Sequence, residues 1–121
     1  MKAFNHCKSS VKYFGGEEDD YLKIHQWFDE SKTHYADIRH RALRHHTEGI
    51  FQCENYFGKV ITNSSGRKVP VRLIGEQHIL EDLGWIPTIK DWFINIDTQT
   101  WMKRTGTHPK LRNPSLYKDD T

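Results

Sequence analysis

One stripe of apolar side chains constrains this chain more than any other feature of its sequence. Hydrophobic residues, with one histidine among them, recur every three or four positions across residues 32–57. Residues at these spacings share one face of an α-helix, so the pattern predicts a single helix of about seven turns, ended by Gly58. Gly49 lies inside it, costs about 1 kcal/mol relative to alanine, and would permit close packing or a slight bend. The members of the stripe are Tyr35, Ile38, Ala42, His46, Ile50, Cys53 and Phe57.

The hydrophobic period changes after Gly58, from that of a helix to that of a strand. Two alternating segments flank the turn-forming sequence Asn-Ser-Ser-Gly at 63–66. This arrangement predicts a β-hairpin across residues 60–72. Pro70 has no amide hydrogen, so it places the second strand at an edge.

Shorter helices are predicted on both sides of these elements. The residues expected to begin or end them are Asn5, Gly15, Asp19 or Asp20, Gly84, and the capping-box pair Thr88 and Asp91. One of these helices spans residues 75–83. The predicted fold class is therefore mainly α with a small β-hairpin (α+β), in which shorter helices pack around one long central helix.

Length and composition indicate one globular domain. A chain of 121 residues is long enough to bury one core, and we expect residues 1–104 to form it. Residues 105–121 contain prolines and basic residues without periodicity, which predicts a basic, partly ordered tail. Mean hydropathy is −0.82, and no apolar run approaches the roughly 20 residues that a membrane span requires. We therefore expect a cytoplasmic protein without a membrane partner.

Cysteine usage excludes one class of site, and the net charge disfavours another. Cys7 and Cys53 are the only cysteines, and in a cytoplasmic chain we expect both to be reduced. No CxxC pair is present, which excludes a thiolate zinc knuckle. The net charge is only +2, which argues against binding nucleic acid by wholesale electrostatic attraction.

Histidines and carboxylates at helical spacing indicate a metal site. Four of the eight histidines lie within residues 34–46, and a helix presents ligands three or four positions apart to one ion. The candidate metal ligands are Asp37, His40, His46 and His78, with Glu76 and Asp82 as candidate catalytic bases. Imidazole and carboxylate suit Zn²⁺ or Mn²⁺. No HExxH, HxH or HD motif is present. A solvated face with Asp37–Arg41 ion pairing is the more common reason for such a pattern, and a histidine in the position of His46 is usually buried and hydrogen-bonded.

The same region also has the composition of a phosphate site. Arg41, Arg44 and His45 could face one ligand together, and Arg72 could extend that surface. Arginine forks match phosphate oxygens, so a nucleotide or a nucleic-acid phosphate is the natural partner. A metal-assisted phosphodiesterase would combine both kinds of site.

The order of the elements predicts where this site lies. A hairpin reverses the chain, so the helix at 75–83 should return towards the long helix and pack through Leu80 and Leu83. His78 should then lie close to His40, His45 or His46 of the long helix. We expect these residues to form one site at that junction.

Three sequence motifs resemble those of a family of small bacterial and phage proteins of unknown function. The motifs are HxWFDxSK at 25–32, DxRHRAxRHH at 37–46 and IGEQHxxxDxGxIP at 74–87. The resemblance extends from about His6 to Met102 and does not cover the tail. It implies a bacterial or phage origin, with the host cytoplasm as location for a phage protein, and it implies no activity. It therefore leaves open a non-enzymatic alternative, in which a phage-encoded interaction protein acts on a host or defence component and the histidines are structural. An exposed apolar patch would indicate an oligomer.

Overall fold

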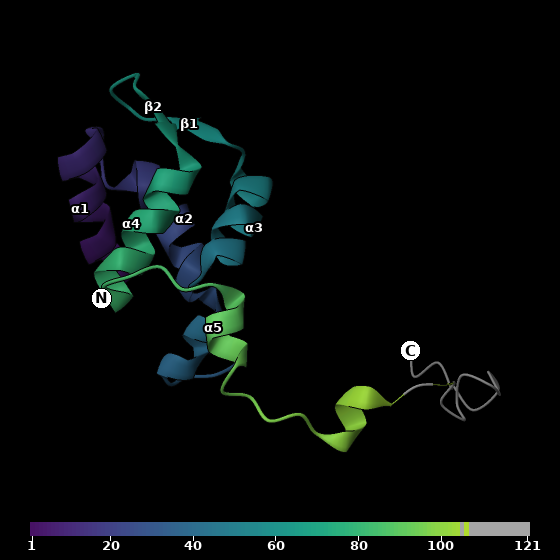
Figure 1. The fold of residues 1–121 in the computed structure, drawn as a ribbon. Helices are drawn as coiled ribbons and strands as arrows, with labels where there is room; N and C mark the ends of the chain where they lie inside the picture. The colour runs from purple at the N-terminus through teal and green to yellow at the C-terminus, as the bar shows by residue number, and fades with distance from the viewer. Residues whose placement is uncertain (105, 107–121) are drawn as a thin grey trace, which may run out of the picture.

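The computed structural model describes residues 1–104 and 106 as a bundle of short helices with one hairpin (Figure 1). The predicted tail at 105–121 therefore lies outside the described residues, apart from Gly106. The elements in chain order are α1 (Ala3–Phe14), α2 (Asp19–Asp29), η1 (Glu30–Thr33), η2 (Ile38–Leu43), α3 (Thr47–Phe57), β1 (Val60–Thr62), β2 (Lys68–Pro70), α4 (Val71–Leu83), α5 (Ile89–Phe93) and η3 (Thr100–Lys103).

Helix α4 is the element around which the others pack. It contacts α1, α2 and α3, while the hairpin lies at one end of these helices and α5 at the other (Figure 1). Gly75 of α4 sits against the ring of Phe28, where a Cβ atom would lie 3.0 Å from that ring. Among the described residues, no helix is both long and apolar enough to cross a membrane. The buried core consists of Cys7, Tyr21, Ile24, Trp27, Phe28, Ile50, Cys53, Val69, Val71, Ile74 and Ile79.

The predicted long helix across 32–57 is wrong, although the mainly α class with a small hairpin is confirmed. Residues 30–33 and 38–43 form two 3₁₀ helices, and the chain leaves helical geometry at Arg44–His46 before α3 begins at Thr47. Tyr35 and Ile38, the first two members of the stripe, are exposed. The break is stabilised by His46, whose Nδ1 accepts a hydrogen bond from the amide of Gly49 and so caps α3. Gly49 allows the carbonyl of Arg44 to approach the helix closely, because any Cβ there would overlap it.

The hairpin forms where the change of period predicts it. Strands β1 and β2 pair antiparallel, with Val60 opposite Pro70 and Thr62 opposite Lys68. Helix α4 begins directly after Pro70, four residues before the expected start at Gly75. Val71 looked like part of a strand in sequence, but its amide donates to the carbonyl of Lys59 and its side chain enters the core.

Helix ends agree with the expected signals at some positions and differ at others. Gly15 and Gly84 follow α1 and α4 with positive φ, and Thr88 and Asp91 form the predicted capping box of α5. Asn5 does not cap α1, since that helix already begins at Ala3. Asp19 and Asp20 lie in the first turn of α2 instead of preceding it.

Candidate metal centre

Two helices each contribute a histidine and an aspartate to one face. Helix α2 carries His25 and Asp29, and α4 carries His78 and Asp82, each pair four residues apart. Residues four apart on a helix project to the same side. Because α2 and α4 pack together, the two pairs meet between them.

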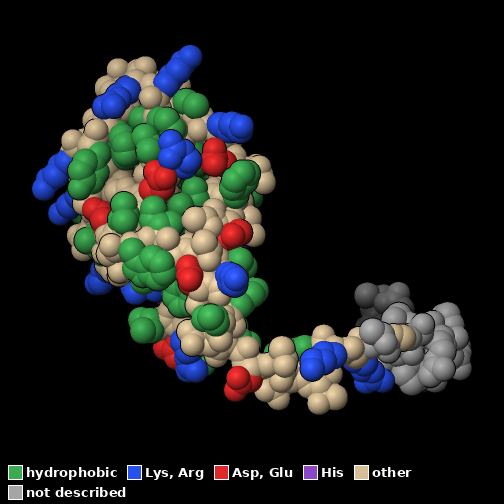
Figure 2. Space-filling view, in the orientation of Figure 1, with side chains coloured by type: hydrophobic (Ala, Val, Ile, Leu, Met, Phe, Trp, Pro, Cys, Tyr) green, Lys and Arg blue, Asp and Glu red, His purple; other side chains and the backbone are tan. Residues whose placement is uncertain are grey.

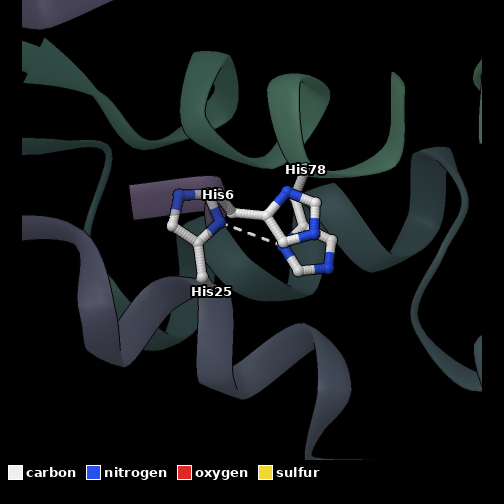
Figure 3. A group of neighbouring side chains, drawn as sticks. All are labelled: His6, His25 and His78. Carbon is white, nitrogen blue, oxygen red and sulfur yellow. Dashed lines mark hydrogen bonds between the residues drawn. The ribbon is translucent and has the colours of Figure 1, made fainter. Parts of the chain in front are cut away.

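Three further histidines reach this junction from other segments. His45 lies in the break between η2 and α3, with its ring centroid 5.0 Å from that of His78. His6 of α1 stacks on His78 with the ring centroids 3.9 Å apart (Figure 3). His40 of η2 lies at the margin, 6.0 Å from the ring of His45. The expectation that His78 approaches the 40–46 region is confirmed, and His45 is its neighbour there.

Four atoms at this junction have the spacing of ligands around one ion. The Nε2 atom of His45 lies 2.9 Å from Oδ2 of Asp82 and 3.7 Å from Oδ1 of Asp29. The Nε2 atom of His78 lies 3.2 Å and 3.4 Å from the same two oxygens. Ligands bound tetrahedrally to zinc at about 2.0–2.2 Å are separated by about 3.3–3.6 Å. These residues could therefore hold a metal ion with little rearrangement.

The junction is enclosed by protein. His45 and His78 are fully buried, and the side chains of Asp82 and Asp29 are 1% and 12% exposed. Figure 2 shows apolar and charged side chains mixed over one face of the molecule, with no histidine visible there. Burying two carboxylates is unfavourable unless cationic groups or a metal compensate their charge.

The carboxylates and imidazoles shift one another's pKa values. Burial opposes ionisation of Asp82, but the imidazoles of His45, His6 and His78, within 3.2 Å of its oxygens, hold its pKa below the ordinary value. Burial also disfavours charge on His78, yet Asp29 and Asp82 outweigh this effect and raise the pKa of His78. The junction thus favours a positive charge between the two carboxylates.

A chain of hydrogen bonds determines which nitrogen of His25 carries its proton. The amide nitrogen of Gln77 donates to the carbonyl of His6 at 2.8 Å and to Oε1 of Glu81 at 2.8 Å. The amide oxygen of Gln77 must then accept from the hydroxyl of Ser10, 2.6 Å away. With that hydrogen used, Oγ of Ser10 accepts from Nε2 of His25 at 2.7 Å.

The same chain of hydrogen bonds fixes the tautomer of His78. Burial, followed by repulsion from His78 and His6, lowers the pKa of His25 to about 2, so its ring is neutral with its hydrogen on Nε2. Its bare Nδ1 must accept from Nδ1 of His78, 2.9 Å away (Figure 3). The raised pKa of His78 favours a second proton on Nε2, which points between Asp29 and Asp82. When His78 is neutral, this nitrogen presents a lone pair to both carboxylates instead.

The rings of His6 and His40 are each oriented by an oxygen atom that contacts Nδ1. Nδ1 of His6 lies 2.8 Å from Oε1 of Glu81, and Nδ1 of His40 lies 2.8 Å from the carbonyl of Asp37. Both contacts place the ring hydrogen on Nδ1 when the ring is neutral, which leaves Nε2 bare. Metal-binding histidines usually donate their second nitrogen to such a partner. His45 differs, because its Nδ1 has no partner among the described residues.

Two cationic groups compensate part of the carboxylate charge. Nη2 of Arg41 lies 3.8 Å from Oδ1 of Asp82, and the amino group of Met1 lies 3.1 Å from the same oxygen. Both contacts are on Oδ1, so they leave Oδ2 of Asp82 to face His45 and His78.

The structure gathers some of the predicted site residues and separates others. His78, Asp82 and His45 lie in the junction, with His40 and Arg41 at its edge. Asp37 lies outside, because its exposed carboxylate caps η2 and pairs with Arg39.

The remaining predicted residues also lie outside the junction. Glu76 forms a surface ion pair with Arg72, since it is two positions from His78 and points to another side of α4. Arg44 stacks on Trp27, and His46 is fully buried as the cap of α3, which agrees with the expectation of a buried, hydrogen-bonded histidine.

Sequence reasoning missed His6, His25 and Asp29. The spacing of His25 and Asp29 is the same as that of His78 and Asp82, and both residues fall within the motif at 25–32, so a search for His-x-x-x-Asp pairs could have found them. His6 carried no comparable signal, because its carboxylate neighbours lie more than seventy positions away.

Acidification of the metal-free protein is expected to lower its free energy of unfolding. Burial lowers the pKa of His25 and of His45, so unfolding takes up protons on both, and stability present at pH 7 is lost as pH falls through the ordinary value of 6.5. His78 acts oppositely, because its raised pKa gives stability that is complete below 6.5 and lost as pH rises. Urea unfolding in EDTA at pH 7.5 and 5.5 measures the balance. A midpoint that rises at pH 5.5 would contradict this expectation.

Comparisons with known proteins identify a family and no activity. Residues 1–102 match the family described as a domain of unknown function, DUF6915. No curated protein and no solved structure matches the chain. The match covers most of the 121 residues, including every residue of the junction. The chain therefore belongs to the DUF6915 family.

Proposed function

We propose that this protein binds one divalent metal ion, Zn²⁺ or Mn²⁺, at Asp29, His45, His78 and Asp82. The observation that carries the proposal is that Nε2 of His78 points between two buried carboxylates, where it needs either a proton or a metal ion. A lone pair that faces two negative oxygens is unfavourable without a cation between them. A metal ion can take the place of the proton there, and nitrogen and oxygen donors suit both metals.

The burial of the four proposed ligands favours an ion with a structural role over one with a catalytic role. The four proposed ligands come from α2, the break before α3, and α4, so one ion would connect three segments. Structural zinc sites have four protein ligands, whereas catalytic sites keep a position open for water. The proposed ligand set has four members and little exposure, which supports the first kind of site.

Metal-assisted hydrolysis of a phosphate-bearing ligand, as by a phosphodiesterase, is a second candidate. Arg41 supports it, because its side chain is partly exposed and lies beside Asp82, where it could contact a phosphate next to the ion. A bound ion would lower the pKa of a water molecule and so supply the nucleophile. Arg44 and Arg72 give less support, since they contact Glu30 and Glu76 of the same chain.

Metal titration of the stripped protein tests the main proposal. After dialysis against chelator, calorimetry with Zn²⁺ and with Mn²⁺ should show one ion bound per chain for at least one of them, and elemental analysis should agree. His78→Ala should abolish stoichiometric binding, because it removes the anchoring nitrogen. His34→Ala is the matched control, since His34 is exposed and lies outside the junction, and it should bind as the unmodified protein does.

The same preparations separate the alternatives. Failure of the unmodified protein to bind either metal would overturn the proposal. In a non-enzymatic interaction protein with structural histidines, His78→Ala would lower thermal stability with no metal to lose. Turnover of a chromogenic phosphodiester by the metal-loaded protein alone would support hydrolysis.

A further inference from the structure

An apolar groove and an exposed arm lie at the α5 end of the molecule. The groove has a volume of about 670 Å³ and is lined mainly by apolar and aromatic side chains, among them Tyr35, Leu43, Trp92 and Ile96. We define the arm as residues 97–104. It follows the segment after α5 and runs away from the helices (Figure 1).

The arm carries apolar side chains that its own body does not cover. Trp101 is 72% exposed and Met102 is 45% exposed. Within the part of the chain that the structure describes, the hydrogen bonds of residues 97–104 are all made inside the arm, as from the amide of Met102 to the carbonyl of Gln99. A short 3₁₀ turn with local hydrogen bonds and exposed aromatic surface has little reason to be ordered in isolation.

The groove and the arm belong to one chain but do not meet within it. Ile96 lines the groove, and the chain then continues outward, so the arm would have to reverse direction to enter the groove at its own root. Eight residues can extend for about 28 Å, which allows the arm to reach a neighbouring molecule. The charged side chains in the groove's lining are already paired, since Asp91 caps α5 and Arg39 contacts Asp37, so the match between arm and groove rests on apolar surface.

We propose that the arm of one copy occupies the apolar groove of a second copy of this chain, and that the arm of the second copy occupies the groove of the first. This proposal is independent of metal binding. A reciprocal exchange is a two-fold arrangement, in which every contact is made twice. The two Trp101 side chains alone would bury about 300–500 Å². The exchange also covers apolar side chains on both surfaces that the single chain leaves exposed.

Light scattering of the full chain during size-exclusion chromatography tests the exchange. The expected mass is twice the 14.4 kDa of one chain. Trp101→Ala in the arm and Leu43→Asp in the groove should each raise the dissociation constant by at least about 100-fold, because a buried tryptophan is often a dominant interface residue. Both positions are exposed in the single chain, so neither change should prevent folding. Phe51→Ala is the matched control, since Phe51 is 71% exposed on α3, away from both surfaces, and it should leave the dimer intact.

Mixing the two variants separates exchange from other contacts. The Leu43→Asp copy retains an arm and the Trp101→Ala copy retains a groove, so the mixture should form a heterodimer through one exchange although each variant alone is monomeric. A monomeric unmodified chain would overturn the proposal and would leave the groove to a small ligand or to residues beyond 104. A dimer that persists in Trp101→Ala would equally overturn it, because the interface would then lie elsewhere.

Discussion

Asp82→Asn is expected to lower the free energy of unfolding of the metal-free protein by about 3–5 kcal/mol at pH 7. The side chain of Asp82 is 1% exposed, and its two oxygens lie within 3.2 Å of nitrogens of His6, His45 and His78. Asparagine keeps the size of the side chain but removes its charge, so the imidazoles lose the anion that compensates them. Urea unfolding followed by circular dichroism measures the loss, and metal titration should show that binding is lost as well.

Asp37→Asn is the matched control for this change. Asp37 also pairs with a cation, Arg39, but its side chain is 48% exposed and water screens the pair. We expect its unfolding midpoint to stay close to that of the unmodified protein. If Asp82→Asn were as stable as Asp37→Asn, the buried carboxylate would not be ionised and paired as the geometry indicates.

Gly49→Ala is expected to cost about 3 kcal/mol and to weaken metal binding, although it adds only one methyl group. The new Cβ would overlap the carbonyl oxygen of Arg44 and lie 2.6 Å from its carbonyl carbon. Backbone atoms cannot move aside as the end of a flexible side chain can, so the Arg44–His46 segment must shift. That segment carries His45, whose Nε2 would move away from Asp82. Thermal unfolding and metal titration of the same preparation measure the two effects.

Gly66→Ala separates this overlap from the general cost of adding a methyl group. Gly66 has φ +85° and no atom within 4 Å of an added Cβ, so alanine there meets only backbone strain of about 1–2 kcal/mol. Because the turn is remote from the junction, metal binding should be unchanged. Equal losses of stability and metal affinity in the two variants would show that the Arg44 contact has no special role.

Local signals in the sequence predicted the elements whose structure depends on a few neighbouring residues. The hairpin follows from an Asn-Ser-Ser-Gly turn between alternating segments, and the start of α5 follows from the Thr88–Asp91 capping box. Gly15 and Gly84 end helices because each adopts a positive φ. These features could be predicted because their energy comes from contacts within a few positions.

The break in the predicted long helix could not be predicted from periodicity. On a continuous helix, His40 and His45 would be separated by about 140° around the axis and could not face one carboxylate. In the folded chain Nε2 of each lies within 4 Å of Oδ1 of Asp29. Contacts with other helices, of His40 and His45 with Asp29 of α2 and of His45 with Asp82 of α4, thus decide the conformation of residues 34–46. The apolar stripe across these residues is partly coincidental.

The candidate site was predicted to the extent that its residues lie on one helix or on consecutive elements. His78 and Asp82 follow from their spacing on α4, and the return of α4 after the hairpin brings them to His45. Helices α1 and α2 contribute His6, His25 and Asp29 to the junction only because of the way four helices pack together. A residue pattern within one helix cannot predict that packing. The tautomers of His25 and His78 depend in turn on Ser10 and Gln77, which had no role in the sequence prediction.

The two cysteines lie on different helices, so the reactivity of each thiol reports how often its own helix opens. Cys7 on α1 and Cys53 on α3 are free and fully buried, and burial raises their pKa values to about 11 and about 12. The thiolate is the reactive form, so both thiols should be nearly inert towards alkylating reagents until their helix opens. The rate at which each is alkylated therefore measures separately how often α1 and α3 leave the bundle.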